Sequence, residues 1–212
     1  MCAKRYSSPE FASKDLLYIH VMRVALALAV CLSATALFAQ SRSYEVRKDP
    51  KNLVEFHAED TYDAFDGKTS NVSGTIVADA AKATASKVDL SIDLASLDTG
   101  IALRNHEMRE RYLQTPRFPA ATFKSVSIDG PDAVAANQPA DLKLTGDFTL
   151  HGVTKRVTLP ARVVLLPDNR IHVTSSFSVH MPDYDIHVPK NILVTVDDMI
   201  PVRLDLWAVA TR

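Results

Sequence analysis

The side chains best suited to chemistry in this sequence are its histidines. Six of them follow the apolar N-terminal segment, and these are His57, His106, His151, His172, His180 and His187. A zinc site often takes two histidines from an H-x-H or H-x-x-x-H pair, because these spacings can aim both imidazoles at one ion. Neither spacing occurs here, His57 and His172 occupy polar positions of alternating segments, and His151 lies in a short connection. The histidines therefore predict no metal site.

A second group of titratable side chains falls within one short stretch, which contains His180, Asp183, Asp185 and His187. A solvated turn is the simpler interpretation of this stretch. Nucleophilic catalysis also lacks its usual signatures, because there is no Gly-x-Ser-x-Gly elbow and both cysteines, Cys2 and Cys31, precede the expected mature chain. We therefore predict a protein that is not an enzyme, with no catalytic residue and no cofactor.

The composition of the 212-residue chain argues against several other classes of protein. With 47% hydrophobic and 23% charged residues, the chain has the composition of a globular protein. Its 24 lysines and arginines nearly balance its 25 aspartates and glutamates, which gives no broad attraction to nucleic acid or to an anionic membrane. Only 6 glycines are present, too few for repeated phosphate-binding loops. We expect a globular protein that binds no nucleic acid.

The N-terminal segment has the layout of a secretory signal peptide. A Met-Arg pair precedes the uncharged, mostly apolar run Val24–Ala39. Cleavage after Ala36 would use Ala34 and Ala36 as the small residues, whereas cleavage after Ala39 would place the bulkier Leu37 two residues earlier. The run is shorter than the roughly 20 residues that a membrane span needs. We therefore predict residues 1–39 as an N-terminal extension and signal peptide and residues 40–212 as a single mature domain. No stable membrane span remains after cleavage, and the expected location is periplasmic or secreted.

From Tyr44 onward, the dominant pattern is the alternation of apolar and polar residues, as a half-buried strand requires. The predicted strands are Leu53–Ala58, Ser70–Ala78, Val88–Leu94, Ala121–Ile128, Leu142–Leu150, Val157–Leu165, Arg170–His180, Asn191–Asp197 and Val202–Ala210. The connections between them are short, which favours antiparallel pairing. About eight or nine antiparallel strands are therefore expected.

One interval, Gly100–Gln114, breaks this pattern and predicts a short helix, because it contains strong helix formers and Pro116 stops further growth. Leu103, Met108 and Tyr112 stand at helical spacing and are expected to face inward. The charged residues of this helix are Arg104, Glu107, Arg109, Glu110 and Arg111. They could form a docking surface or a gate, but a solvated face with i,i+3 and i,i+4 ion pairs, Glu107 with Arg111 among them, is the simpler interpretation.

An antiparallel sheet of this size must hide its apolar face, and with so little helix it closes into a barrel or splits into a sandwich. An eight-stranded barrel either fills its interior with side chains or encloses one small ligand. The inward residues are mainly valine, leucine and isoleucine, which would line an apolar cavity suited to a lipid. We therefore predict an all-β fold, a single antiparallel eight-stranded barrel with one short helix.

Two stretches of the sequence resemble the YceI-like family of exported, polyisoprenoid-binding bacterial proteins. They are Ile92–Ser125, with the motifs S-L-D-T-G, R-x-x-x-M-R and F-P-x-A-T-F, and Leu144–Pro160, which begins L-T-G-D-F-T-L-H-G-V-T. The resemblance covers roughly Tyr44 to Ala210. It implies a lipocalin-like barrel that holds a long isoprenoid or related lipid in its lumen, with no established chemical turnover.

The sequence also departs from the family pattern. Ile101 stands where the family commonly has Asn, Asn105 where it has Asp, and Glu107 where it often has His. Within Met181–Asp198, D-Y-D-I replaces the usual D-F-G-I, and the apolar run Ile192–Val196 is inserted. Polar contacts near the cavity mouth are therefore expected to differ from those of the family, and neither ligand length nor head group carries over.

The residues that we predict to contact the lipid are Leu90, Ile92, Leu94, Leu103, Arg104, Met108, Phe123, Leu144, Phe148, Val173, Phe177 and Leu204. Arg104 is the polar member, expected to fix the helix or to meet a lipid head group. The predicted function is sequestration or carriage of a long apolar lipid, of polyisoprenoid or isoprenoid quinone type. The alternative is a packed barrel that serves as a scaffold or interaction module, whereas an enzyme would need a polar pocket. A homodimer is compatible with the sequence.

Overall fold

The computed structural model describes residues 41–189 and 196–211 of the chain. Its strands are β1 (Arg42–Val46), β2 (Leu53–Glu59), β3 (Ala64–Thr69), β4 (Val72–Ala78), β5 (Lys87–Asp93), β6 (Ala120–Asp129), β7 (Pro139–Leu150), β8 (Val153–Leu165), β9 (Arg170–His180) and β10 (Met199–Ala210). The helical elements are α2 (Ala102–Glu107), the π-helical turn η3 (Met108–Tyr112), and the short 3-10 turns η1 (Ala83–Ala85), η2 (Leu94–Ser96) and η4 (Met181–Tyr184). The fold is all-β with one short helix, as predicted.

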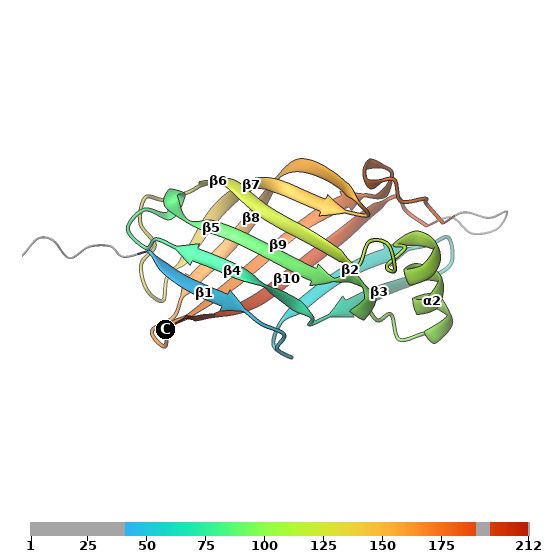
Figure 1. The fold of residues 1–212 in the computed structure, drawn as a ribbon, viewed down its shortest axis with the longest axis horizontal. Coiled ribbons are helices and arrows are strands. Elements are labelled where there is room, and N and C mark those ends of the chain that lie inside the picture. Colours follow the sequence, from blue (N-terminus) through green and yellow to red (C-terminus); the bar gives the residue numbers. More distant parts are fainter. Residues whose placement is uncertain (1–40, 190–195, 212) are drawn as a thin grey trace, which may run out of the picture. The chain divides into compact units, whose positions relative to one another are not determined.

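The strands close into an antiparallel barrel, which Figure 1 shows from the side. β1 pairs with β4 on one side and with the end of β10 on the other. Further along β10 its partner is β2, and β3 pairs with β2. β1 with β2, and β3 with β4, therefore each act as one interrupted strand, so that the barrel has eight strand positions around its circumference. The predicted eight-stranded barrel is confirmed.

The side chain of Asn52 bridges the interruption between β1 and β2. Asn52 is only 2% exposed. Its Nδ2 donates to the carbonyl of Arg47 at 2.8 Å, and its Oδ1 accepts from the backbone N–H of Trp207 at 2.8 Å. Trp207 lies on β10 between the residues paired with β1 and those paired with β2. The amide therefore satisfies backbone groups that the broken ladder would leave without partners.

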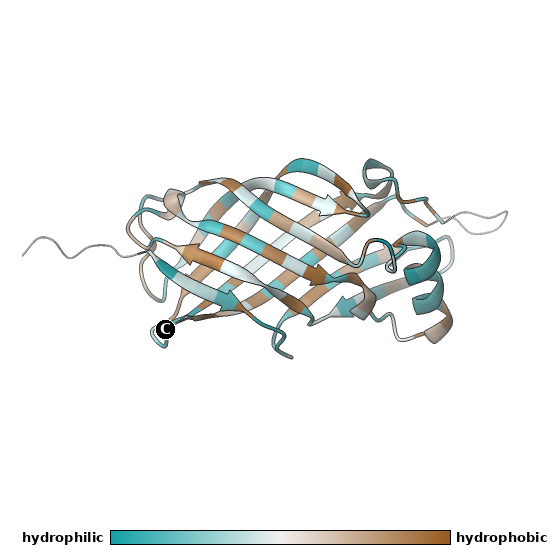
Figure 2. Ribbon diagram, viewed as in Figure 1, coloured by the Kyte–Doolittle hydropathy of each residue, from teal (hydrophilic) through white to brown (hydrophobic). Residues whose placement is uncertain are grey.

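Alternate residues of each strand face the interior of the barrel, and apolar and polar bands accordingly alternate along the strands in Figure 2. On β7, Leu142, Leu144 and Phe148 are buried, whereas Lys143 between them is exposed. The barrel interior is therefore apolar, and most charged side chains project from the outer surface.

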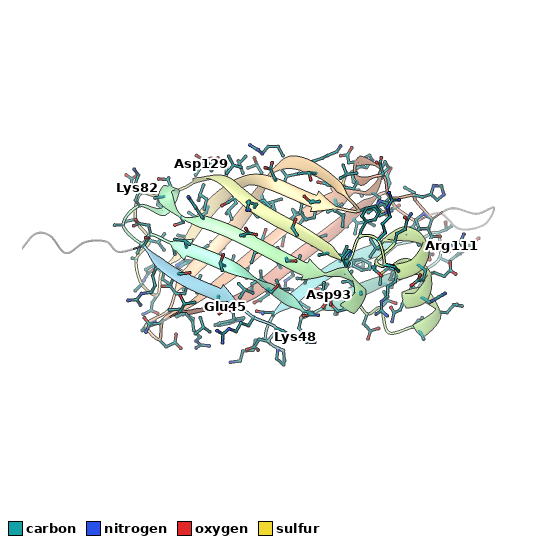
Figure 3. All side chains as sticks on the ribbon, in the orientation of Figure 1. Glu45, Lys48, Lys82, Asp93, Arg111 and Asp129 are labelled. Atoms are coloured by element: carbon teal, nitrogen blue, oxygen red, sulfur yellow. The ribbon has the colours of Figure 1, made fainter. Side chains whose placement is uncertain are left out.

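The two ends of the barrel are covered by different elements. At one end, η1 and the loop 130–138 pack together, with the N–H of Ala83 donating to the carbonyl of Asp132 at 3.0 Å. At the other end lie α2 and η3 (Figure 1). Figure 3 shows Lys82 at the first end and Arg111 at the second. We call these the η1 end and the α2 end.

Several strand predictions differ from the structure. β1 and β3 were not predicted, because β1 has only five residues and β3 carries Gly67 at an inward position, which weakens the alternation. Leu94 belongs to η2 rather than to a strand. The predicted strand Asn191–Asp197 lies mostly outside the described residues. Of its described residues, Val196 forms a single bridge to Asp60, and Asp197 is not in a strand.

The helix predicted over Gly100–Gln114 changes its pitch midway. Its second half is the π turn, in which the N–H of Leu113 donates to the carbonyl of Met108, five residues back, at 2.8 Å. This wider turn brings Met108 and Leu113 to the same side of the helix. Both residues, together with Tyr112, reach the barrel interior.

Candidate functional site

The barrel interior contains two adjoining cavities. The inner chamber, of about 100 Å³, lies toward the η1 end, and the mouth chamber, of about 340 Å³, lies toward the α2 end. Ile92, Phe148 and Phe177 line both chambers, so the two share one wall. The mouth chamber alone lies within the roughly 300–1,000 Å³ typical of small-molecule sites. A barrel packed solid with side chains would leave only voids of about one water molecule, which disfavours the packed-scaffold alternative.

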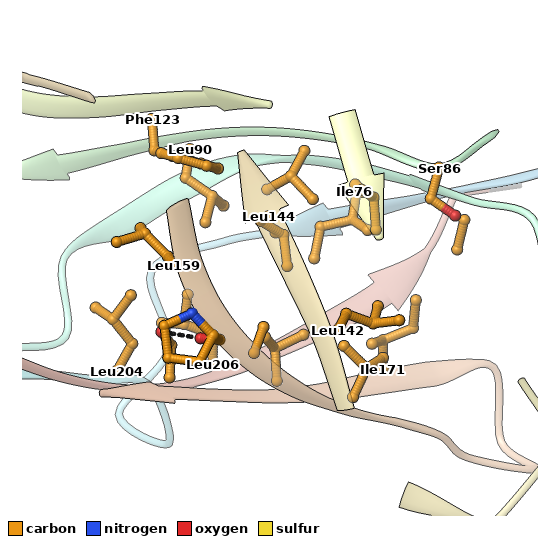
Figure 4. A pocket seen from close by; sticks show the side chains of 18 of the residues that line it. Ile76, Ser86, Leu90, Phe123, Leu142, Leu144, Leu159, Ile171, Leu204 and Leu206 are labelled. Atoms are coloured by element: carbon orange, nitrogen blue, oxygen red, sulfur yellow. Dashed lines mark hydrogen bonds between the residues drawn. The ribbon is translucent and has the colours of Figure 1, made fainter. Parts of the chain in front are cut away.

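The inner chamber is walled mainly by aliphatic side chains, among them Ile76, Leu142, Leu144, Leu159 and Leu204 (Figure 4). The hydroxyl of Ser175 also lines it and donates to the carbonyl of Pro160 at 2.6 Å. At the η1 end, Asp79 Oδ1 accepts the N–H groups of Ala81 and Lys82 at 3.0 and 2.9 Å. These polar atoms already have partners, so the chamber offers its contents an apolar surface.

Three aromatic rings meet where the chambers join. The centroid of the Phe148 ring lies 6.1 Å from that of Phe177 and 5.5 Å from that of Tyr184, and both pairs are edge to face. The rings come from β7, β9 and η4, so three separate elements fix their arrangement. We call Phe148, Phe177 and Tyr184 the aromatic waist.

The mouth chamber combines apolar walls with a few ionisable side chains. Val54, Phe56 and Phe65 contribute apolar surface from β2 and β3, whereas Arg104, Glu107 and Asp60 contribute charge. The carboxylate of Glu107 accepts from Arg111 Nη1 at 2.8 Å, which confirms the predicted i,i+4 pair. Asp60 Oδ1 caps a turn by accepting the N–H groups of Tyr62 and Asp63. The mouth chamber is therefore the polar end of an otherwise apolar lumen.

Arg104 is held firmly at the mouth chamber. Its Nε donates to Thr99 Oγ1 at 3.0 Å and its Nη2 donates to the Thr99 carbonyl at 2.9 Å. The guanidinium carbon lies 3.9 Å from the centroid of the Phe65 ring, a cation–π contact. Asn105 Oδ1 in turn accepts from both the N–H and the hydroxyl of Thr99 at 2.8 Å. Within the described residues Arg104 forms no ion pair, and its Nη1 has no hydrogen-bond partner.

The lumen brings together all but one of the twelve residues predicted to contact a lipid. The inner chamber takes Leu90, Phe123, Leu144, Val173 and Leu204, the mouth chamber takes Leu94, Arg104 and Met108, and Ile92, Phe148 and Phe177 line both. The exception is Leu103, which is 71% exposed and lines neither chamber. Its predicted inward orientation is wrong because Arg104, the next residue, takes the inward position. Whether these side chains contact a lipid stays a prediction.

Several lining residues were not predicted. Val54 and Phe56 alternate on a strand that was predicted, so the pattern already indicated that they face inward. Phe65 gave no such signal, because the next inward position on β3 is Gly67. A Cβ atom at Gly67 would lie 2.0 Å from the ring of Phe56, so this glycine makes room for that ring. Tyr184 stands in the turn-rich stretch that was interpreted as solvated, yet it is buried.

The histidines on the strands point away from the lumen and pair with carboxylates. His57 Nδ1 lies 2.8 Å from Asp66 Oδ1, and His172 Nε2 lies 2.8 Å from Asp205 Oδ1. The hydrogen bond with Asp66, and then that with Glu59, raises the pKa of His57. No group of three or more histidine, cysteine, aspartate or glutamate side chains in the described part of the chain could hold a metal ion.

His151 differs from the other histidines because it is buried. Its Nδ1 lies 3.1 Å from the carbonyl of Tyr184, and its ring centroid is 4.6 Å from that of Phe118. Its Nε2 is buried without a partner among the described residues. His151 thus connects the β7–β8 turn to η4, the element that carries Tyr184 of the aromatic waist.

None of the helices in residues 41–189 and 196–211 is long and apolar enough to cross a membrane.

The fold of this chain is similar to that of several solved structures. A polyisoprenoid binding domain from Saccharophagus degradans matches with a TM-score of 0.62 and 20% identity, over 81% of this chain and 100% of that domain. Burkholderia cenocepacia BcnA matches with a TM-score of 0.64 and 21% identity, over 75% of this chain and 97% of its own. At 20% and 21% identity, this similarity shows the fold alone.

Sequence comparison gives the family. Protein YceI of Escherichia coli is 34% identical over 131 residues, which span 59% of this chain and 64% of the relative. A UPF0312 protein of Shewanella denitrificans is 40% identical over 104 residues, about half of each chain. The match thus spans less than two thirds of these relatives. The model of the YceI-like domain matches residues 44–208. Because that match covers most of the sequence, the chain belongs to the YceI-like family.

Proposed function

We propose that this protein is an exported, non-enzymatic carrier that holds one long-chain isoprenoid lipid in its barrel lumen. The observation that carries the proposal is the pair of adjoining apolar chambers between the α2 end and the η1 end. A long chain fits this arrangement better than a compact ligand does, because the two chambers lie end to end along the strands.

Burial of the chain would supply the binding energy. Each methylene removed from water contributes about 0.8 kcal/mol, so ten buried methylenes contribute about 8 kcal/mol. Association and ordering of a flexible chain cost several kcal/mol of this gain. Micromolar affinity corresponds to about 8 kcal/mol of net binding energy, so a tightly held chain must bury more than ten methylenes by entering both chambers.

Arg104 lines the mouth chamber alone, so it makes the two ends of the lumen chemically different. We assign to it the contact with the lipid head group. Its Nη1 has no partner among the described residues, and Thr99 and Phe65 fix the rest of the guanidinium. Asp60 and Glu107 line the same chamber, so a strongly anionic head group would meet their carboxylates. A neutral head with a carbonyl or hydroxyl oxygen, as in an isoprenoid quinone, accepts from Nη1 without that repulsion.

Export rests on the apolar segment Val24–Ala39, which lies outside the described residues. Expression of the whole chain in a Gram-negative host, followed by fractionation and N-terminal sequencing, tests it. We expect periplasmic protein that begins at Leu37 or Gln40. Full-length protein retained in the cytoplasm would contradict export.

Lipid carriage is tested on the same purified protein. Native mass spectrometry should show added mass, and organic extraction should release a prenyl lipid. Protein recovered empty, with no uptake of polyprenols or quinones on incubation, would favour a scaffold without ligand. Turnover of an added lipid would point to an enzyme.

A further inference from the structure

The aromatic waist lies on the route between the two chambers. Phe148 and Phe177 line both cavities, whereas Tyr184, 4% exposed, is packed behind Phe148. The Phe148 ring contacts both other rings edge to face, with interplanar angles of 78° and 75°. Phe148 is therefore the common member of the waist.

We propose that the aromatic waist makes lipid selection depend on chain length in two steps. This inference rests on the proposed carriage of a lipid in the lumen. A chain short enough for the mouth chamber binds without disturbing the three rings. A longer chain reaches the inner chamber only when the Phe148 ring gives up its edge contacts.

The surroundings of the three rings indicate that Phe148 is the one that moves. Tyr184 is held by its own backbone, since its carbonyl lies 3.1 Å from His151 Nδ1. Lys155 Nζ also lies 5.9 Å from the Tyr184 ring centroid. The Phe148 ring has edge contacts with both other rings and no hydrogen-bonding group, and rotation about its χ1 leaves β7 in place.

The inner chamber supplies the gain that offsets this rearrangement. Its walls beyond the waist include Leu144, Leu159 and Leu204, and its polar Ser175 is already hydrogen-bonded. Each further isoprene unit that enters removes apolar surface from water. Affinity should therefore rise with chain length, level off where the mouth chamber is full, and rise again once the chain passes the waist.

The variants that test this are Phe148→Leu and Phe177→Leu, with Phe56→Leu as the matched control. Phe56, like Phe177, is a half-buried lumen phenylalanine, but it lines the mouth chamber alone. All three substitutions remove a ring and keep an aliphatic side chain. Thermal unfolding of each variant shows whether it is folded, and either waist variant suffices for the test.

The measurement is the affinity of delipidated protein for prenyl alcohols of two to eleven isoprene units. We expect a plateau in the wild-type series. In a waist variant the plateau should disappear, and the ratio of longest-chain to shortest-chain affinity should rise about tenfold. Phe56→Leu should keep the plateau.

Three results would contradict these expectations. A smooth rise with chain length in the wild-type protein would overturn the role of the waist while leaving carriage intact. Equal changes in the waist variants and in Phe56→Leu would do the same. Absence of binding for every chain length in the wild-type protein would instead refute the proposed function itself.

Discussion

Replacing Arg104 with methionine removes the cation that lines the mouth chamber but keeps a long side chain that can still contact Phe65. In the proposed complex the lost interaction is a hydrogen bond from a charged donor, Nη1, to an oxygen of the head group. Such bonds contribute about 1.5–3 kcal/mol, which corresponds to roughly 10- to 150-fold weaker binding. A lipid with the same chain and no oxygen in its head should lose little affinity.

The substitution also has a cost in folding, which must be separated from its effect on binding. Thr99 loses the two hydrogen bonds that Arg104 donates to it, at 3.0 and 2.9 Å. Asn105 still holds Thr99 through two bonds of 2.8 Å, so the turn before α2 keeps its anchor. We therefore expect a lower Tm with the barrel intact, as judged by circular dichroism.

The assay is a comparison of two lipids with one chain length, a prenyl quinone and the corresponding prenyl hydrocarbon. The ratio of their Kd values isolates the head group from the chain. Arg104→Lys should recover part of the preference, because it restores a charge without the planar fork. Arg111→Gln is the control, since Arg111 is 68% exposed at its side chain and pairs with Glu107. The reasoning fails if Arg104→Met weakens both lipids equally, or if Arg111→Gln has the same effect.

Three further substitutions test the fold that positions the lumen. Asn52→Ala should lower the free energy of unfolding by about 1–3 kcal/mol in a denaturant titration, because two partly buried backbone groups lose their partners; a change below about 0.5 kcal/mol would contradict the bridging role. Gly67→Ala should reduce lipid affinity by pushing the Phe56 ring into the mouth chamber, with unchanged affinity as the contrary result. The pKa of His57 is raised by Asp66, so its contribution to stability is full below the unfolded pKa of about 6.5 and is lost as the pH rises through the higher folded value. The Tm difference between wild type and His57→Gln should therefore be larger near about pH 5.5 than near about pH 8.5, and a pH-independent difference would exclude this coupling.

The long strands could be predicted because each shows a burial pattern with a period of two residues. β7 alternates buried and more exposed positions over most of its length, and its side chains repeat that pattern in sequence. The interruption between β1 and β2 could not be predicted in this way. It depends on Asn52, whose side chain acts as a backbone substitute, and an asparagine in sequence indicates a turn more often than a buried bridge.

The helix shows a different limit of periodicity. A regular helix of 3.6 residues per turn places Leu103 on the same face as apolar residues further along, but the structure exposes Leu103 and turns Arg104 inward. The π turn over Met108–Tyr112 changes which of the following residues face the barrel. A pattern with a fixed period cannot locate such a shift. Tertiary packing of the helix over the mouth chamber decides which of its residues face inward.

The two faces of the sheet separate the strand histidines His57 and His172 from the lumen. His57 and His172 were predicted at polar positions of strands, and each pairs with a carboxylate on the outer surface. A general base must come within about 3 Å of the proton that it removes, and a strand position that faces outward cannot reach a ligand inside. Among the ionisable side chains that line the mouth chamber, Glu107 accepts from Arg111 and Arg104 donates to Thr99. Asp60 accepts two backbone N–H groups. Arg104 Nη1 has no hydrogen-bond partner among the described residues, and this nitrogen can donate to a head-group oxygen but cannot accept a proton.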